Sequence, residues 1–470
     1  MNPHDRQQVE KARRRPGNVS GLSTERQIAM TSPQPRTPYH MGPDPRQGQE
    51  LPTVAALCTT FNSGHGRHTV ERFLMGYEYD GRMHYPPFRV VSMYVDQIND
   101  GDLSDVRAEQ YGFEKFADIA GALTLGTGEL AVDNILLVCE NGIYPTNDKG
   151  QIEYPRYEWF RQVVEVFRAS GRSVPVFNDK HLSFEWSKAR WMYDQQVDLD
   201  FAMLAGSSLP TTWRLPELEI PVGTGLQEIV AVYPGHIEAY GIHSLEAMQC
   251  LAERRDGGET GVTAVQYLEG DEVWAAARDG RWSRDLLDAA LYRAVPRAIV
   301  EQKRQWTNDE VEDLCREHAL TRTARPEDVV ETPVALLVEY RDGLKASCIN
   351  LTGYVTAEFA VAASTDAQEV LSTLFFLGGG PQSAYHGVQV HHIEELFKNK
   401  RANYPIERTL LTSGVLAFLM ESRVGGHRRI ETPELTVAYD PPLASTFERG
   451  IMPILCPWCP EGRYTPAAAS

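Results

Sequence analysis

Three ionisable side chains follow a short apolar segment in the first half of the sequence. Residues 174–178 read VPVFN and lead directly into Asp179, Lys180 and His181. A lysine here could polarise a hydroxyl or carbonyl oxygen as a point charge, and partial burial would lower its pKa and ease proton transfer. Histidine exchanges protons near neutral pH. These residues could therefore perform acid–base chemistry, although Lys180 could also be a surface residue at the start of a helix.

A second set of such residues lies further along the chain. His243 and Glu246 fall in a predicted helix over residues 242–254. His243 is a candidate acid–base group, and the alternative is a histidine on a helix face that is satisfied by a neighbour. We expect Lys180 to orient and activate a substrate oxygen while His243 moves the proton. Both side chains should then line one cleft that water can reach.

Candidate binding residues follow two other predicted strands. Glu140 and Tyr144 come just after the strand predicted at 132–139, and both should point toward the same rim. Ser207 and Arg214 follow the fifth predicted strand. A hydroxyl and a guanidinium there could hold a polyol or a carboxylate, unless this segment is only a turn between domains.

Alternating strands and helices position these residues over 51–212. Short apolar runs predict strands at 54–58, 88–95, 132–139, 174–178 and 201–205, and amphipathic spacing predicts helices between them at 69–77, 105–110, 157–170 and 184–196. This alternation implies right-handed crossovers and a parallel sheet. Ligands bind at the carboxyl edge of such sheets, where the candidate residues should meet.

Residues 213–445 predict a second, α+β domain. Longer alternating segments at 227–233, 263–268, 334–340 and 344–350 indicate an open, mainly antiparallel sheet backed by a few helices. We expect the site to lie in the cleft between the two domains. The two ends of the chain differ from both, with a disordered extension expected at 1–50 and a Pro-rich tail at 446–470.

Two metal-like patterns in the second half are expected to be structural. His386, His391, His392, Glu394 and Glu395 lack HExxH spacing and are more typical of the polar face of an amphipathic helix. Cys456 and Cys459 form a CxxC without a second pair, which is weak evidence for a redox or zinc role.

The composition limits the function classes. The 470 residues carry 46 Lys and Arg against 64 Asp and Glu, a formal net charge of −18, with 42% hydrophobic residues. An acidic chain disfavours a general nucleic-acid binder. No apolar run reaches the length of a membrane helix, the first residues do not resemble a secretory signal, and seven cysteines do not make a disulfide framework. A cytoplasmic enzyme of several domains is expected.

The motif order resembles the glucose–fructose oxidoreductase/inositol dehydrogenase (Gfo/Idh/MocA) family. Asp179-Lys180-His181-Leu182 stands where that family has Glu-Lys-Pro-Leu, and Gly241-Ile242-His243 begins a Gly-x-His-x-x-Asp motif in which Glu246 replaces the Asp. Tyr404-Pro405-Ile406 follows near the end. The resemblance implies a Rossmann-like domain, NAD or NADP, a sugar, cyclitol or related substrate, and homo-oligomers that pair through the open face of the second sheet.

Individual roles follow from the same resemblance. Lys180 takes the place of the lysine between nicotinamide and substrate, and His243 that of the catalytic histidine. Asp179 and Glu246 take neighbouring catalytic positions, and Asp96 takes that of the acid that binds the ribose. His181 would contact substrate, and Glu140 would lie beside the cofactor.

The sequence departs from the family at two places. No GxGxxG follows the first strand, because Thr60, Phe61 and Asn62 stand where glycines are expected and Gly64 and Gly66 come late. Nucleotide binding should therefore be weak or shifted, since Cβ atoms obstruct close approach of a pyrophosphate. Ala239 also replaces an Asp that many members place four residues before the histidine.

Two other function classes remain open for these reasons. A divalent metal could occupy the place of the nicotinamide, bound by His65, His68, Glu140 and His181, in an NAD-independent lyase, hydrolase or isomerase. Alternatively, the chain could be a non-catalytic sensor or scaffold that has lost its nucleotide site.

Overall fold

The computed structural model describes residues 44–62, 64–378 and 383–453. Residues 1–43 of the predicted extension lie outside the described residues, as do Cys456 and Cys459.

Six parallel strands form the first sheet, in the order β5-β4-β1-β6-β7-β8. Their bounds are β1 Thr53–Cys58, β4 Arg89–Val95, β5 Glu114–Lys115, β6 Asn134–Val138, β7 Val176–Asp179 and β8 Met203–Gly206. The strand order reverses at β1, and such a switch point is where open α/β sheets bind ligands. The predicted Rossmann-like sheet is therefore confirmed.

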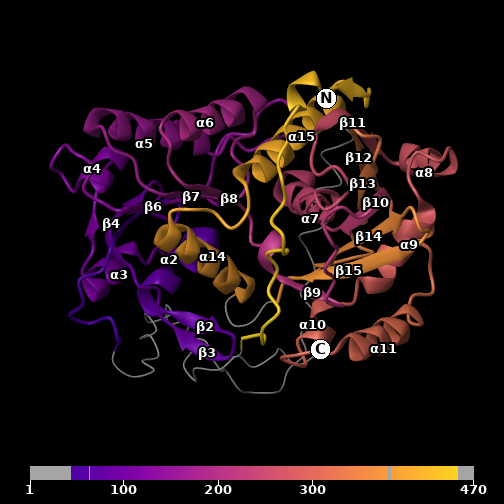
Figure 1. The fold of residues 1–470 in the computed structure, drawn as a ribbon, viewed down its shortest axis with the longest axis horizontal. Coiled ribbons are helices and arrows are strands. Elements are labelled where there is room, and N and C mark those ends of the chain that lie inside the picture. Colours follow the sequence, from indigo (N-terminus) through magenta and orange to yellow (C-terminus); the bar gives the residue numbers. More distant parts are fainter. Residues whose placement is uncertain (1–43, 63, 379–382, 454–470) are drawn as a thin grey trace, which may run out of the picture. The chain divides into compact units, whose positions relative to one another are not determined.

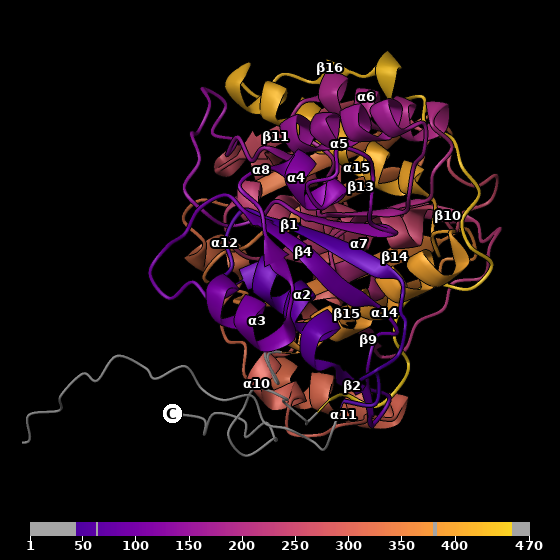
Figure 2. The ribbon, with the colours of Figure 1, turned by 90° about the vertical axis from the view of Figure 1, so that its left-hand side faces the viewer.

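Helices cover both faces of this sheet (Figures 1 and 2). One face carries α4 (Ile119–Thr124), α5 (Arg156–Ser170) and α6 (Trp186–Asp198), and the other carries α2 (Gly64–Met75), α3 (Ser104–Tyr111) and, from much later in the chain, α14 (Tyr385–Asn399). Alternate residues of β1 point to opposite cores, Ala55 and Leu57 toward α5 and Val54 and Ala56 toward α2. Burial on both faces explains the uninterrupted apolar run.

The second sheet has eight strands in the order β16-β11-β12-β13-β10-β14-β15-β9. Its strands are β9 Trp213–Leu215, β10 Leu226–Tyr233, β11 Val262–Glu269, β12 Val334–Tyr340, β13 Lys345–Asn350, β14 Phe359–Thr365, β15 Val370–Phe376 and β16 Ile430–Glu431. Only the β10–β13 pair is parallel, so the predicted mainly antiparallel sheet is confirmed.

Helices also cover both faces of the second sheet. In β10, Ile229 and Ala231 pack toward α7 (Ile242–Ala252) and α15 (Ile406–Val424), whereas Val230 and Val232 pack toward α9 (Arg284–Arg293). The resemblance predicted that copies of the chain pair through an open face of this sheet. In the structure, α9 covers one face across β10, β14 and β15, and α7 and α15 pack on the other.

The remaining elements are short or lie at the edges of the sheets. They are the hairpin β2 (Tyr77–Tyr79) and β3 (Arg82–His84), α8 (Asp271–Arg278), α10 (Arg297–Val300), α11 (Asn308–Ala319), α12 (Pro326–Val329), η3 (Leu209–Thr211), η4 (Ile237–Gly241) and η5 (Pro433–Leu435). Among the helices of the described residues, none is both long and apolar enough to cross a membrane.

The ordered chain begins earlier than predicted. Residues 44–50 were assigned to the disordered extension, but Arg46 donates hydrogen bonds to the carbonyls of Phe73 (2.7 Å), Leu74 (2.8 Å) and Pro86 (3.0 Å). Composition could not predict this contact, because the segment is held by hydrogen bonds from one arginine and not by buried apolar side chains.

Candidate functional site

The carboxyl ends of β7 and β8 bring the first candidate residues together. Lys180 follows β7 with a φ of +60°, and its backbone N–H donates to the carbonyl of Gly206 at 3.1 Å. Gly206 ends β8 with a φ of +137°, and a Cβ there would lie 2.8 Å from the Tyr404 hydroxyl. This close approach requires glycine and turns the chain so that Ser207 enters the site.

Lys180 belongs to a buried group of three charges. Its Nζ lies 2.7 Å from Glu140 Oε1, and Arg156 pairs with the other oxygen of the same carboxylate. Burial alone would lower the pKa of Lys180, but the Glu140 charge outweighs burial and raises it. The sequence predicted a lowered lysine pKa, whereas in the structure the pKa of Lys180 is raised by Glu140.

His243, Ser207 and Glu246 form a hydrogen-bonded chain. The Ser207 hydroxyl donates to Glu246 Oε2, so its oxygen accepts from His243 Nδ1 at 2.8 Å. The Ser207 amide also donates to Glu246 Oε1 at 2.8 Å, which fixes the carboxylate. Because the Ser207 hydroxyl has one hydrogen and donates it to Glu246, the hydrogen between Ser207 and His243 must belong to His243 Nδ1. In the neutral imidazole, Nε2 is then unprotonated and can act as a base.

Lys180 and His243 share this neighbourhood. Lys180 Nζ also donates to the carbonyl of Ala239 at 3.4 Å, in the turn η4 that leads into the helix carrying His243. Burial lowers the pKa of His243, with Glu246 acting against this shift and the Lys180 charge adding to it. Only 5% of Lys180 and 8% of His243 is exposed, so both side chains are largely buried.

Glu238 is an acid–base candidate that the sequence analysis missed. Its carboxylate accepts from the Ile152 amide at 2.9 Å, and it lies near the charges of Arg156, Glu140 and Lys180. Burial raises its pKa to about 7, against the opposing effect of the Ile152 bond. Its position beside Ala239, where the family motif expects an acid, was the available signal.

The four residues considered for a metal are engaged elsewhere. His65 Nδ1 bonds to Asp179 Oδ2 at 2.7 Å, and His68 stacks on His386 with ring centroids 5.2 Å apart. His181 Nε2 lies 3.4 Å from an Arg156 nitrogen, and Glu140 already balances two cations. Within the described part of the chain, these residues do not form a group of converging ligand atoms.

The loop after β6 closes over the start of α2. The Asn141 side-chain oxygen accepts from the His65 amide at 3.1 Å, in the first turn of that helix. A Cβ on Gly64 would lie 2.1 Å from the same oxygen. Gln97 exchanges two hydrogen bonds with the backbone of Ile143, at 3.0 and 2.9 Å, and thereby holds the loop in place.

Most of the predicted nucleotide-binding side chains already make contacts within the protein. Two tyrosine hydroxyls donate to Asp96, from Tyr94 at 2.8 Å and from Tyr144 at 2.7 Å. Phe61 is buried in the core beneath α2, and Asn62 donates to the carbonyl of Asp100 at 3.3 Å. Thr60 is buried, and its hydroxyl has no partner among the described residues.

Two contacts of this arrangement compete with a dinucleotide. A pyrophosphate needs the free amides of a helix N-terminus and close backbone approach. Here Asn141 accepts from one amide of that N-terminus, and Tyr94 and Tyr144 both donate to the acid that would bind a ribose.

Arg214 lies apart from the other candidates. It belongs to β9, donates to the carbonyl of Leu218 at 2.9 Å, and packs over the rings of Phe375 and Phe447 at 5.0 and 4.4 Å. These contacts describe an arginine that supports the second sheet.

No model of a known protein family matches the sequence, and no curated protein matches it either. Solved structures do match over most of both chains. GenD2 from gentamicin A biosynthesis, in complex with NAD, is 12% identical with a TM-score of 0.49 and covers 83% of this chain and 99% of its own. A myo-inositol dehydrogenase from Corynebacterium glutamicum is 11% identical with a TM-score of 0.46, and the match covers 81% of this chain and 99% of that one. Myo-inositol dehydrogenase from Lactobacillus casei, in complex with NAD(H) and myo-inositol, is 10% identical with a TM-score of 0.48, and the match covers 81% of this chain and 97% of that one. At these values the family resemblance remains a prediction.

Proposed function

We propose that this protein is a lyase or isomerase that moves protons on a small hydroxy-carbonyl compound, of the sugar or cyclitol class, without a dinucleotide. The observation that carries the proposal is the chain from Glu246 through Ser207 to His243, which leaves a neutral imidazole with a free Nε2. Such a base can remove a proton from the carbon next to a carbonyl group.

Lys180 supplies the charge that this reaction needs. An ammonium has three N–H donors, and Lys180 directs one to Glu140 and one to Ala239. The third can donate to the substrate oxygen that becomes negative as the proton leaves. Because the site is buried, that interaction is stronger than it would be in water.

Glu238 completes a balanced elimination. His243 Nε2 takes the proton, the C–H electrons form the new double bond, and the C–O bond to the neighbouring hydroxyl breaks. Glu238, whose pKa is raised to about 7, donates a proton so that the hydroxyl leaves as water. His243 is then protonated and Glu238 ionised, and one proton returned from His243 to Glu238 restores the site. Without the leaving group, the same proton transfers give an isomerisation.

A test of this proposal follows solvent exchange. The protein is incubated in D2O, without nucleotide, with a panel of ketoses and keto-cyclitols, and deuterium entry next to the carbonyl is measured by NMR. Lys180→Met and His243→Ala should each slow exchange by about 10²-fold, the size of a typical acid–base contribution. Ser207→Ala should also slow it, because it breaks the chain to Glu246. Ser208→Ala is the matched control, since its neighbour Thr211 bonds to the Ser208 backbone carbonyl, which alanine keeps. Absence of exchange with every compound would refute the proposal.

An NAD(P)-dependent oxidoreductase is the second candidate. It is favoured by the reversal of strand order at β1, directly before α2. Calorimetric titration of NAD(H) and NADP(H) distinguishes the two candidates. Ordinary micromolar binding by the unmodified protein, together with nucleotide reduction by a polyol, would establish the second. Binding gained only by Asn141→Gly would support the first, because the loop would then be shown to occlude the helix.

A further inference from the structure

Three side chains of metal-binding type converge away from the candidate site. His84 ends β3, and His391 and Glu394 lie one turn apart on α14. One ligand atom from each lies within 4.8 Å of the others, and His84 Nε2 is 2.7 Å from Glu394 Oε2. Two elements far apart in the sequence therefore present two imidazoles and a carboxylate to one point.

A simple His–Glu pair does not account for this cluster. Nδ1 of His391 is buried and has no hydrogen-bond partner among the described residues. The His391 ring is held by stacking on Tyr79, with centroids 4.1 Å apart. Glu394 is fully buried, which is costly for a carboxylate unless positive charge compensates it. Lys398 supplies part of this charge through an ion pair at 3.5 Å, although one third of its side chain is exposed to solvent.

We propose that His84, His391 and Glu394 bind one zinc ion. Two nitrogens and one oxygen suit Zn²⁺, and three protein ligands leave a fourth position for water. The Tyr77 hydroxyl donates to Glu394 Oε1 at 2.6 Å, so this carboxylate has the kind of hydrogen-bonded support that orients metal ligands. About 31% of the His84 side chain is exposed, which gives the ion a route from solvent.

The zinc ion would join the hairpin β2–β3 to α14. An earlier turn of that helix carries Gln389, which donates to the carbonyl of Gly206 at 3.1 Å, and His386, which stacks on His68. The metal would therefore stabilise a helix that supports the carboxyl edge of the parallel sheet. This inference is independent of the proposed reaction.

The experiment measures zinc binding directly. The full chain is prepared without a histidine tag, with Cys456→Ser and Cys459→Ser to remove the CxxC thiols, and is stripped with a chelator. Calorimetry with ZnCl₂ should give one ion per chain, and thermal unfolding should shift upward when zinc is added. Co²⁺ should give visible d–d bands without thiolate charge transfer. Absence of zinc binding by this doubly substituted protein would overturn the proposal.

Ligand variants then locate the ion. His84→Asn and His391→Asn should each weaken zinc binding by more than about 100-fold, beyond what loss of a supporting partner costs. His427→Asn is the matched control, because His427 forms a 2.7 Å pair with Glu272 on the surface. Circular dichroism checks that each variant is folded, and His84 is the safer position because it is partly exposed. Unchanged affinity in a folded His84→Asn, or equal loss in His427→Asn, would refute the site.

Discussion

Individual side chains in the candidate site hold their charges through buried partners. Glu140 is 7% exposed and Lys180 5%, so neither charge is hydrated well enough to stand alone. Removing one partner of a buried pair is costly because the other charge is left uncompensated. The same contacts that prepare Lys180 for catalysis therefore also contribute to stability.

Replacing Lys180 by methionine should destabilise the fold. We expect a loss of about 3 kcal/mol, near the lower end for a broken buried pair because Arg156 still faces Glu140. Lys188→Met is the control, since Lys188 pairs with Glu158 and Glu185 at the surface and should cost less than about 1 kcal/mol. Urea unfolding measures both. Equal effects would show that Lys180 is not held as a buried ion.

Glu238 should make stability depend on pH. Its pKa is about 7 in the folded protein against 4.5 for an ordinary glutamate, so the folded state holds the extra proton between these values. This contribution is complete below pH 4.5 and is lost as the pH rises through 7. Glu238→Gln should remove that loss, which is on the order of 3 kcal/mol.

The measurement compares unfolding free energies from pH 5 to pH 8. The difference between the parent protein and Glu238→Gln should change in favour of the variant as the pH rises. Exposed Glu129→Gln serves as the control and should run parallel to the parent. A parallel curve for Glu238→Gln would mean that this carboxyl group titrates normally.

Among the elements, the loop that follows β6 decides what can reach the start of α2. The Asn141 oxygen of this loop accepts a hydrogen bond from the His65 amide, as a phosphate oxygen would at a helix N-terminus. Hydrogen bonds of Gln97 with Ile143 and of Tyr144 with Asp96 hold the next residues of the loop. The first turn of α2 thus receives a hydrogen bond from a distant part of the chain.

Asn141→Ala should expose that helix N-terminus. Loss of a capping oxygen costs about 1 kcal/mol, so thermal unfolding should occur at a slightly lower temperature. Inorganic phosphate should then restore part of the loss in the variant, because an anion can satisfy the free amides. Asn147→Ala, in the following turn, tests whether any loop asparagine has this effect. Phosphate that stabilises both variants equally would exclude a specific site at α2.

Much of this organisation was predictable, and its limits have physical causes. Apolar runs identified β1, β6 and β7 because strands buried on both faces leave an unambiguous pattern. The position of Asp179 and Lys180 at the end of an apolar run placed them at the carboxyl edge of the sheet, where β7 ends at Asp179. In contrast, Asn141 could not be identified as a cap, since its partner His65 is distant in sequence. The same holds for His84, which meets α14 only through the fold.

Across the whole molecule, late segments of the chain complete early structure. The helix α14 packs on the same face of the parallel sheet as α2, and α15 packs on the second sheet as well as on α6. The Trp213 side chain donates to the carbonyl of Gly450 at 2.8 Å, which ties the last described residues to β9. Neither sheet is therefore expected to be stable without the segment after residue 383.

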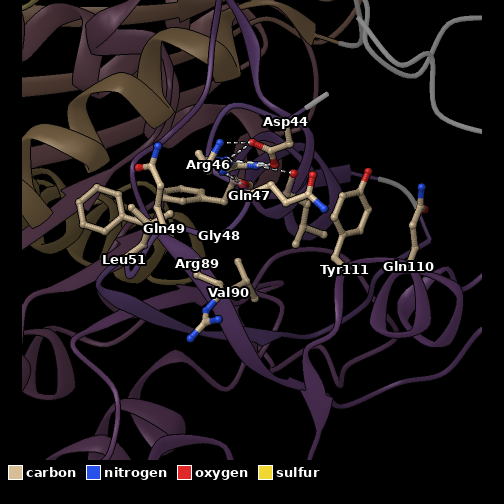
Figure 3. A pocket seen from close by; sticks show the side chains of 13 residues that line it. Asp44, Arg46, Gln47, Gly48, Gln49, Leu51, Arg89, Val90, Gln110 and Tyr111 are labelled. Atoms are coloured by element: carbon tan, nitrogen blue, oxygen red, sulfur yellow. Dashed lines mark hydrogen bonds and ion pairs between the residues drawn. The ribbon is translucent and has the colours of Figure 1, made fainter. Parts of the chain in front are cut away.

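The amino-terminal end makes a corresponding contact, and Arg46 should be needed for full stability. Its guanidinium caps α2 at the other end, by donating to the carbonyls of Phe73 and Leu74 in the last turn. Figure 3 shows Arg46 beside Asp44. Helix ends leave such carbonyls without partners, and arginine can satisfy them. Arg46→Ala should therefore lower the free energy of unfolding by about 1–3 kcal/mol, the cost of buried polar groups left unpaired.

Arg46 lines a cavity of about 670 Å³ at the amino edge of the parallel sheet, and Arg89 lines it too and serves as the matched control. Arg89 is exposed there at the start of β4, and Arg89→Ala should change stability by less than about 0.5 kcal/mol, as most surface substitutions do. Urea unfolding of both full-length variants gives the comparison. Two deletions give a second comparison. The variant without residues 1–50 should have a lower free energy of unfolding than the variant without residues 1–43, and the difference should equal the loss caused by Arg46→Ala. If the two deletions are equally stable, the contacts of Arg46 do not hold the end of α2.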